Sequence, residues 1–521
     1  MTRIDREDGR SLRSGFLRSA AQTPCAPCLV IKGETLTYGE VERLARCLAS
    51  NIVARLGRPA RRIGIFASRN REAYVGVLAA LFAGGSFVPL NPNFPAGRTR
   101  AMIEASDLDA IIVDAALSAR LDEILDGYSS PPLLIMPDKG AESLEADPGG
   151  AATNLPSVMS EDIAYILFTS GSTGTPKGVP VTNANVCSFI DWAVSHYAIT
   201  AKDRFSQTFD QTFDLSIFDL FVAWERGATV YAMQPLDLLA PARFIRNNAL
   251  TVWFSVPSIP ALMRRKGTLA DAALPSLRLS LFCGEPLPLA TARAWQAAAS
   301  NSVVENLYGP TELTIACMWH RWDEQVSPPL CINGIVPIGR PFAGLGAALV
   351  DDELKLVPDG EAGELCLCGA QTTPGYWRDP GRTADRFVRL SGDEQAAGIF
   401  YRTGDLARRL PDGTYVYLGR TDHQIKVQGY RVELGEIEAC LQGQQGVIQA
   451  VAIGWPEVDG RADGIVGFVT GNDIDTAACR QAVAAQLPAY MVPSQVLVID
   501  DMPLNANGKI DRRALAATLT S

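Results

Sequence analysis

The feature that most constrains the fold is a glycine- and hydroxyl-rich run, Phe168-Thr-Ser-Gly-Ser-Thr-Gly-Thr-Pro-Lys-Gly178, which follows the apolar segment Ala164–Phe168. The apolar segment has the composition of a buried strand. Glycines let backbone N–H groups approach phosphate oxygens, hydroxyls add donors, and the lysine adds a charge. The run is not a P-loop, because Pro176 stands five residues after Gly171. It indicates a phosphate-binding loop, although such a run alone is more often a plain linker.

Strand-like and helical patterns alternate through most of the chain. Asn183–Tyr197 is a helical stretch, Leu277–Phe282 reads as a strand, and Leu289–Ala299 reads as a helix. Alternation of this kind predicts layered, parallel α/β sheets with ligand loops at the strand ends. From Leu345 to Gly369 the pattern becomes hairpin-like, with a Pro-Asp-Gly turn that is repeated at Pro411–Gly413, so we expect a β-rich subdomain there.

The length of 521 residues predicts more than one domain. The pattern of apolar and polar residues changes after Gly419-Arg-Thr-Asp422. The roughly one hundred residues that remain suffice for a small α+β domain. We therefore expect an α/β protein with a large N-terminal domain over 1–421 and a small C-terminal α+β domain over 422–521, with the boundary near Asp422.

Composition excludes several classes of function. The net charge of -10 disfavours nucleic acid as a partner. The start, Met1 to Arg18, lacks the apolar core of a signal peptide, and the apolar stretch Val75–Ala83 is too short to span a bilayer. Eleven scattered cysteines fit reduced thiols, and three histidines make a His-based triad or a His-rich metal site improbable. We expect a cytoplasmic protein without a membrane partner.

Further runs follow one another in a fixed order. They are Leu36-Thr-Tyr-Gly-Glu40, Leu81-Phe-Ala-Gly-Gly-Ser-Phe-Val-Pro89, Phe213-Asp-Leu-Ser216, Asn306-Leu-Tyr-Gly-Pro-Thr-Glu312, Gly363-Glu-Leu-Cys-Leu-Cys-Gly369, Tyr401-Arg-Thr-Gly-Asp405, Leu418-Gly-Arg-Thr-Asp422, Lys426-Val-Gln-Gly-Tyr-Arg-Val-Glu-Leu-Gly-Glu-Ile-Glu438, Leu487-Pro-Ala-Tyr-Met-Val-Pro493 and Asn507-Gly-Lys509. With the glycine-rich run, they resemble the adenylate-forming superfamily, which comprises acyl-CoA synthetases, luciferases and the adenylation domains of nonribosomal peptide synthetases. The resemblance extends nearly from end to end. It implies that the domain over 1–421 binds ATP and substrate and that the domain over 422–521 is a mobile lid with its hinge near Asp422.

The resemblance implies that a carboxylate attacks the α-phosphorus of ATP and expels pyrophosphate. Because two anions repel, such a site needs cations and oriented donors more than an acid–base pair. The implied cofactors are ATP and Mg²⁺, and Glu312 is the implied metal ligand because a carboxylate suits Mg²⁺. The residues implied to wrap the β- and γ-phosphates are Thr169, Ser170, Gly171, Ser172, Thr173, Gly174 and Lys177.

The same resemblance implies which residues bind the other parts of the nucleotide. Tyr308 is implied to stack on adenine, Asn306 to bind its amino edge, and Thr311 to contact the α-phosphate. Asp405 is implied to accept the ribose hydroxyls. The other residues implied to border the nucleotide are Gly284, Gly309, Tyr417 and Arg420.

Two lysines of the small domain are implied to serve different half-reactions. Lys509 would reach the substrate carboxylate and the phosphate during adenylation, where negative charge concentrates. After a rotation about Asp422, Lys426 and the Gly429 face would serve thioester formation at the pantetheine tunnel. Gln428 departs from the family pattern, which often has arginine there.

Asp214, within Phe213-Asp-Leu-Ser216, resembles the residue that pairs the substrate α-ammonium in the amino-acid-activating branch. Fatty- and aryl-acid ligases have no ammonium to pair. At ~4 Å and an effective dielectric near 20, such a pair is worth about 4 kcal/mol before desolvation. The alternative interpretation is a helix-capping aspartate, and Asp210 in Thr208-Phe-Asp210 is a similar neighbour.

The rest of the implied substrate pocket carries no charge except that of Lys509. Its residues, beside Asp214 and Lys509, are Leu215, Phe218, Ser255, Leu281, Cys283, Leu307, Ile315 and Ala316. A charged substrate side chain would be buried unpaired there, so acidic and basic amino acids are disfavoured. Alanine, serine, cysteine and proline all fit, because one methylene discriminates by only about 1–3 kcal/mol. A β-amino acid also stays open.

The expected product is an aminoacyl thioester. The sequence ends twelve residues after Lys509 without a phosphopantetheine-serine segment. We therefore expect a free-standing phosphopantetheinylated carrier protein, acting in trans in natural-product biosynthesis such as nonribosomal peptide or antibiotic synthesis. The alternatives are a carboxylic acid–CoA ligase and a non-catalytic nucleotide-binding protein, and the presence of Lys509, Lys426 and Glu312 argues against the latter.

Overall fold

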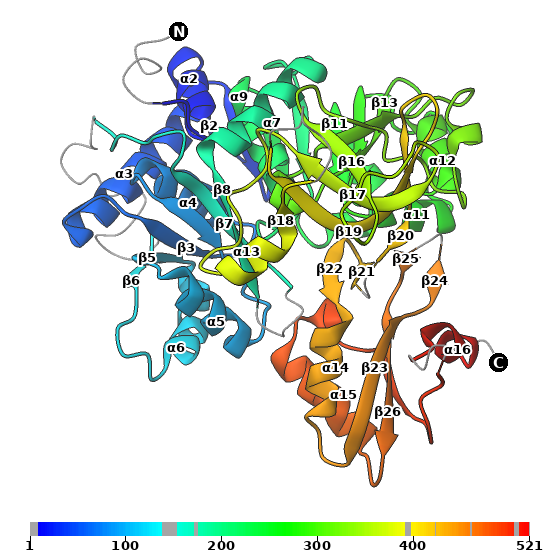
Figure 1. Cartoon of the computed structure of the whole chain (residues 1–521). Coiled ribbons are helices and arrows are strands. Elements are labelled where there is room, and N and C mark those ends of the chain that lie inside the picture. Colours follow the sequence, from blue (N-terminus) through cyan, green and yellow to red (C-terminus); the bar gives the residue numbers. More distant parts are fainter. Residues whose placement is uncertain are drawn as a thin grey trace.

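The computed structural model describes residues 9–137, 154–170, 176–390, 398–421, 424–458, 461–504 and 510–519. Figure 1 shows a large body that carries the N-terminus and a smaller body below it that carries the C-terminus. This arrangement confirms the predicted α/β class with a large N-terminal and a smaller C-terminal part. The predicted boundary residue, Asp422, lies outside the described residues, so the hinge there stays a prediction.

Two layered α/β sheets form the core of the large body. The first has nine strands in the order β15 (Arg340–Pro341), β14 (Met318–Arg321), β13 (Val303–Tyr308), β12 (Leu279–Phe282), β11 (Val252–Ser255), β9 (Arg204–Gln207), β10 (Thr229–Ala232), β1 (Pro27–Ile31) and β2 (Glu34–Thr37). The second has six, in the order β6 (Leu133–Ile135), β5 (Ala110–Val113), β3 (Arg62–Phe66), β4 (Ser86–Pro89), β7 (Ile163–Thr169) and β8 (Lys177–Thr182). Most neighbouring strands are parallel.

Helices cover these sheets. They are α2 (Ser14–Gln22), α3 (Tyr38–Leu56), α4 (Arg71–Phe82), α5 (Ala96–Ser106), α6 (Ser118–Leu125), α7 (Asn183–His196), α8 (Leu215–Ile217), η3 (Phe218–Val222), α9 (Ala223–Glu225), η4 (Asp237–Leu239), α10 (Pro241–Asn247), α11 (Ser258–Arg265) and α12 (Leu289–Ala298). Local sequence sets several of their starts. Thr37 and Glu40 form a capping box before α3, and Thr182 and Asn185 do the same before α7.

The β-rich subdomain predicted after Leu345 is present. Its five strands are β16 (Gly346–Val350), β17 (Ala362–Cys368), β18 (Phe387–Val388), β19 (Phe400–Arg409) and β20 (Tyr415–Arg420), and α13 (Pro380–Arg386) precedes β18. The Pro-Asp-Gly turns join β16 to β17 and β19 to β20, which are antiparallel pairs as predicted.

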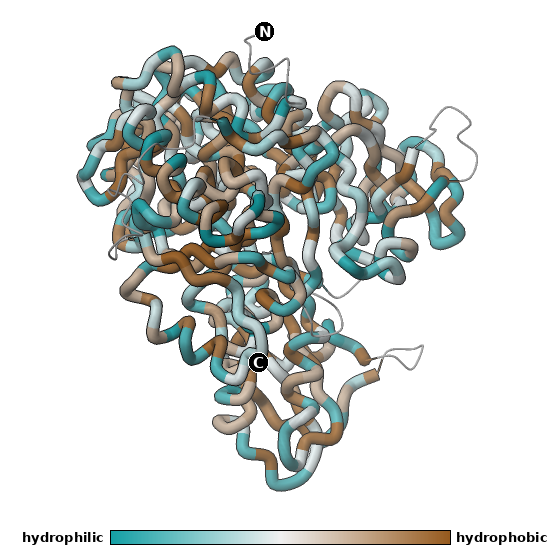
Figure 2. Tube along the Cα trace, turned by 90° about the vertical axis from the view of Figure 1, so that its left-hand side faces the viewer, coloured by the Kyte–Doolittle hydropathy of each residue, from teal (hydrophilic) through white to brown (hydrophobic). Residues whose placement is uncertain are grey.

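The small body has its own apolar core. Its strands are β21 (Gln424–Val427), β22 (Tyr430–Glu433), β23 (Val447–Gly454), β24 (Glu457–Val458), β25 (Arg461–Ala462), β26 (Ile465–Gly471) and β27 (Gln495–Val498). Its helices are α14 (Leu434–Gln442), α15 (Thr476–Gln486) and α16 (Arg512–Ala517). In the hydropathy view, apolar segments run through both bodies, and the small body tapers away from the large one (Figure 2).

The two bodies meet through specific polar and aromatic contacts. Arg98 of α5 pairs with Glu436 of α14 at 3.0 Å, with side chains only 5% and 0% exposed. The ring of Tyr490 stacks on that of Tyr430 within the small body, with 3.7 Å between centroids, and its centroid lies 6.4 Å from that of Phe94 in the large body. Because a buried ion pair requires defined geometry, these contacts fix one orientation of the small body.

Candidate active site

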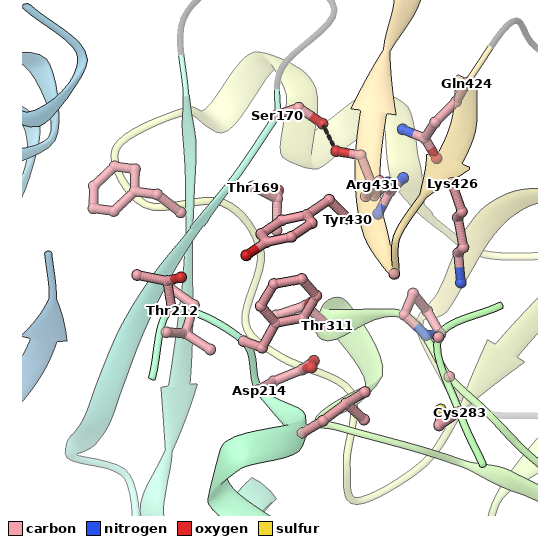
Figure 3. Close-up of a pocket in the computed structure, with 18 of the residues that line it drawn as sticks. Thr169, Ser170, Thr212, Asp214, Cys283, Thr311, Gln424, Lys426, Tyr430 and Arg431 are labelled. Carbon is pink, nitrogen blue, oxygen red and sulfur yellow. Dashed lines mark hydrogen bonds between the residues drawn. The ribbon is translucent and has the colours of Figure 1, made fainter. Parts of the chain in front are cut away.

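Two adjoining cavities lie where the large body meets the small one. Both are bordered by residues at the carboxyl ends of the parallel strands β12 and β13, which is where α/β sheets bind ligands. The residues that line both cavities are Gly284, Tyr308, Gly309, Asp405, Arg420, Gln424 and Lys426. The last two come from β21, so the small body forms one wall of the cleft (Figure 3).

A turn after β13 positions the residues at the centre of the cleft. Gly309 packs so closely that a Cβ there would lie 2.5 Å from the Ala316 Cα. The turn brings Tyr308 and Thr311 to the cleft and places Glu312 in η5 (Thr311–Leu313), fully buried.

The Glu312 carboxylate is held by cations from both bodies. Lys177 Nζ lies 3.1 Å from its Oε1, and Arg431 Nη1 lies 3.1 Å from its Oε2. The Tyr376 hydroxyl donates to Oε1 at 2.8 Å. Burial alone would raise the pKa of Glu312, but the charges of Lys177 and Arg431 hold it well below its usual range. Burial and the neighbouring Arg431 lower the pKa of Lys177 to about 8.

The second cavity contains a hydrogen-bond acceptor from Asn306 that is unpartnered among the described residues. Asn306 donates through Nδ2 to the carbonyls of Val336 and Pro337, at 3.3 and 2.9 Å. Its Oδ1 is buried and has no partner within the described part of the chain. A carbonyl oxygen in this state can accept a hydrogen bond from an amino group on a ligand, and Tyr308, Tyr417 and Ile338 line the same cavity.

Asp405 lies between the two cavities. Its Oδ1 accepts from Arg420 Nη1 at 2.6 Å, and its Oδ2 accepts from the Tyr308 hydroxyl. The Thr403 hydroxyl accepts from its backbone N–H, which holds this end of the β19–β20 pair against the cleft. Adjacent ligand hydroxyls would meet a carboxylate already oriented by two donors.

Asp214 lies at the inner end of the first cavity and is only 8% exposed. Burial raises the pKa of Asp214 to about 6, against a hydrogen bond from the Thr311 side chain that lowers it. Asp210 is different, because it accepts hydrogen bonds from the Thr212 N–H at 3.0 Å and the Thr212 hydroxyl at 2.5 Å in a local turn. Asp214 therefore faces the first cavity, whereas Asp210, four residues earlier, caps a local turn.

The other implied pocket residues divide into two groups. Leu215 and Cys283 line the first cavity and Leu307 the second, whereas Phe218, Leu281, Ile315 and Ala316 lie behind them in the same apolar cluster. Ser255 is turned differently. Its hydroxyl accepts from the Trp253 indole at 3.0 Å and donates to the Val256 carbonyl at 3.2 Å, so in this conformation it is not offered to the pocket.

The hairpin β21–β22 defines which face of the small body meets the cleft. The Ser170 hydroxyl donates to the Arg431 carbonyl at 2.7 Å, and the ring of Phe213 lies 4.4 Å from that of Tyr430. A Cβ on Gly429 would lie 2.5 Å from the Val256 side chain, so only glycine fits this approach. Lys426 faces the same cleft (Figure 3).

The described residues on either side of the Lys509 segment line neither cavity. Leu504 and Ile510 pair with each other, and Ile510 packs with α16 on the face of β23–β26 away from α14. Five predicted residues lie outside the described residues, namely Gly171, Ser172, Thr173, Gly174 and Lys509. The described ends of the loop, Thr169 and Lys177, pair across β7–β8, and the buried Thr169 hydroxyl has no partner in the described part of the chain.

Sequence reasoning assigned no role to two residues that the structure brings to the centre. Arg431 belongs to the motif Lys426–Glu438, but nothing in that motif shows that its guanidinium reaches Glu312. Tyr376 lies in none of the motifs that carry the family resemblance. Their partner is more than fifty residues away from each, so the pairing could be found only from the fold.

Comparison with known proteins identifies the family to which this cleft belongs. The model of the AMP-binding enzyme family matches residues 16–377, and that of the AMP-binding enzyme C-terminal domain matches residues 436–509. The L-proline–[L-prolyl-carrier protein] ligase of Streptomyces coelicolor is 35% identical, over 95% of this chain and 94% of that protein. Tyrocidine synthase 3 of Brevibacillus parabrevis is also 35% identical over 96% of this chain, but the chain spans only 7% of its length.

A solved structure resembles the whole chain. The Vibrio cholerae adenylation domain AlmE, in complex with glycyl-adenosine-5′-phosphate, has a TM-score of 0.88 and 32% identity and covers 98% of both chains. The chain belongs to the AMP-binding enzymes, the adenylate-forming superfamily, as its motifs predicted. Among the described helices, none has the length and apolarity that a bilayer crossing requires.

The turn at Gly309 gives a first prediction. Gly309→Ala should lower the free energy of unfolding by about 1–3 kcal/mol, because the added methyl meets backbone atoms of Ala316 that cannot move aside. Gly97→Ala is the matched control, since a Cβ there meets nothing within 4 Å and Gly97 lies in α5, where alanine is the better helix former. Chemical denaturation measures both. Equal stability of the two variants would contradict the packing described for the turn.

Proposed function

We propose that this enzyme activates a small neutral amino acid as its aminoacyl-adenylate, with release of pyrophosphate, and passes it to the phosphopantetheine thiol of a separate carrier protein. The observation that carries the proposal is Asp214, a carboxylate at the inner end of the cleft between apolar walls. A cation that enters this pocket would meet one opposite charge and few other polar groups.

The substrate ammonium is the cation that fits. With a pKa of about 6, the Asp214 carboxyl is ionised at neutral pH and can pair with it. The apolar walls strengthen this pair by excluding water, and they penalise a second charge on the substrate side chain. The relatives support a small substrate, since one is a ligase for L-proline and another was solved with glycyl-adenosine-5′-phosphate.

The nucleotide residues divide the task of holding ATP. The free Asn306 Oδ1 would accept from the adenine amino group, and Tyr308 would stack on the ring. Asp405, oriented by Arg420, would accept from the ribose hydroxyls. Thr169, Ser170 and Lys177 would donate to the phosphates, and Thr311 would contact the α-phosphate that the substrate carboxylate attacks.

Mg²⁺ fits the site as a shared ion. No cluster of three or more His, Cys, Asp or Glu side chains that could cage a metal occurs in the described ranges. Mg²⁺ often binds one or two carboxylates together with substrate phosphates, and Glu312 supplies such a carboxylate. When bound with ATP, the ion would neutralise charge on the phosphates.

Adenylation and transfer would use different faces of the small body. Lys509 would balance the charge of the attacking carboxylate and the α-phosphate. In the pose described here, Lys426 and Gly429 face the cleft instead, which is the face implied for transfer. A separate carrier is supported by the L-prolyl-carrier protein ligase, which is similar over nearly its whole length.

Amino-acid-dependent exchange of pyrophosphate into ATP, run across twenty amino acids, tests the proposal directly. We expect exchange with one or a few small neutral amino acids. Exchange driven only by carboxylic acids without an amino group, or equal transfer to CoA and to every carrier, would reassign the chain as a carboxylic acid–CoA ligase. Absence of exchange with every acid would leave nucleotide binding alone.

The ammonium contact gives a second prediction. Asp214→Asn should reduce kcat/KM for the amino acid by roughly 30- to several-thousand-fold, because truncating one member of a buried charge pair costs about 2–5 kcal/mol. The des-amino acid, which has no charge to pair, should lose far less. Asp210→Asn is the matched control and should change little, since its side chain caps a turn. A variant at Asp214 that kept the preference for the amino acid would show that the ammonium is bound elsewhere.

The third prediction concerns pH. The raised pKa of Asp214 means that its carboxylate is protonated as pH falls through about 6, so kcat/KM for the amino acid should fall below that value and stay level above it. At saturating ATP and metal, this inflection should be absent in Asp214→Asn. An inflection that survives the substitution would assign the titration to another group.

The fourth prediction separates the two lysines. Lys509→Ala should nearly abolish pyrophosphate exchange but spare transfer from preformed aminoacyl-adenylate, and Lys426→Ala should impair transfer more. Each variant removes the positive charge that one pose brings to the cleft. Single-turnover assays of each step distinguish them. If both variants failed at the same step, the two-pose account would be wrong.

A further inference from the structure

The turn that follows η5 has a strained backbone. Thr314 and Ile315 are consecutive residues with positive φ angles, 55° and 75°. Residues with a branched β-carbon rarely adopt this left-handed conformation, so surrounding contacts have to hold the turn in place. Thr314, Ile315 and Ala316 are all fully buried. Strained backbone of this kind is common beside active sites, where it fixes the position of nearby groups.

This turn forms the back of the amino-acid pocket. Ala316 packs directly behind Gly309, which lines both cavities. The Cys317 N–H donates to the Tyr308 carbonyl at 2.8 Å, so the turn is also tied to the last residue of β13. Ile315 lies in the apolar cluster behind the pocket. A shift of the turn would therefore move the wall of the pocket.

One buried amide side chain holds the turn. Gln371, which is 1% exposed, donates through Nε2 to the carbonyls of Leu313, Thr314 and Ala316, at 3.1, 3.2 and 2.7 Å. Because all three partners are acceptors, the amide nitrogen and not its oxygen must face the turn. In the reverse direction, the Thr314 hydroxyl donates to the Gln371 backbone carbonyl at 2.7 Å. Gln371 thus binds the backbone on both sides of the strained pair.

The segment around Gln371 is itself fixed and also holds Glu312. Asn185, in the capping box of α7, donates through Nδ2 to the backbone carbonyls on either side of Gln371, at 2.8 and 3.0 Å. Further along the segment, the Thr373 N–H donates to the Glu312 carbonyl at 3.0 Å, and the Tyr376 hydroxyl donates to the Glu312 carboxylate. The segment therefore holds Glu312 through its later residues and the pocket turn through Gln371, so substitution can separate the two tasks.

We propose that Gln371 is a positioning residue that sets the shape of the amino-acid pocket, and hence the size of the substrate side chain that the pocket accepts. The inference rests on the proposed function, because its measurable consequence is amino-acid selectivity. Gln371 itself lines neither cavity, so it acts through the backbone of the turn. Loss of its N–H donors would deprive buried carbonyls of a partner and let the strained pair relax, which would displace the pocket wall at Gly309.

Gln371→Met tests the proposal, because methionine keeps the length of the side chain and removes its donors. In pyrophosphate exchange, the KM for the amino acid that the wild-type chain prefers should rise about tenfold, and the KM for ATP should change less than about twofold. The preference over a neutral amino acid one methylene larger should fall about tenfold, within the roughly 10- to 200-fold that one methylene can supply. A merely structural role would lower kcat equally for all amino acids.

Thr314→Val and Thr314→Ser form a second, milder pair of variants. Valine removes the hydroxyl that donates to Gln371 and should lower selectivity in the same direction, whereas serine keeps the hydroxyl and should match wild type. This pair decides the matter if Gln371→Met does not fold.

Gln296→Met is the distant control. It removes the same kind of donor, which binds the carbonyls of Ala299 and Ser302 near the end of α12, and should leave selectivity unchanged. Wild-type selectivity in folded Gln371→Met, or in Thr314→Val, would overturn the role of Gln371 and leave the proposed function intact. Absence of exchange by the wild-type chain with every amino acid would overturn the proposed function itself.

Discussion

The structure depends on one buried negative charge, the carboxylate of Glu312, which receives cations from both bodies of the protein. Lys177 contributes from the end of the β7–β8 hairpin and Arg431 from β22 of the small body. Removing one partner from a buried ion pair typically costs about 3–5 kcal/mol, because the other charge is left uncompensated. The pose of the small body and the charge balance at the floor of the cleft are therefore linked.

This linkage explains why the hairpin β21–β22 meets the cleft in one defined way. Arg431 can reach Glu312 only if its strand lies over the end of β7. There the Ser170 hydroxyl donates a hydrogen bond to the Arg431 carbonyl, which stabilises this arrangement. The same placement seats Gly429 against Val256 and brings Lys426 to the cavity that Asp214 closes. A pose that presented the Lys509 segment instead would have to withdraw Arg431, and Glu312 would then keep one cation or take a new one.

The sequence predicted the fold class and many of the residues that line the cleft. Strand and helix patterns located β7, α7, β12 and α12 to within about two residues, because their apolar periodicity is strong. The motifs located Tyr308, Asp405 and Lys426, which the structure brings together. Long-range pairings were beyond reach, since neither the Arg431–Glu312 contact nor the rotation of the Ser255 hydroxyl toward Trp253 leaves a local signal.

Amide hydrogen exchange of the hairpin Gln424–Glu433 tests the central linkage most directly. If Glu312 holds the small body in place through Arg431, Glu312→Gln should speed exchange in this hairpin, while the amides of α14, packed in the core of the small body, keep their protection. Unchanged exchange at Tyr430 and Arg431 in this variant would show that the pose is held by other contacts and would contradict the account.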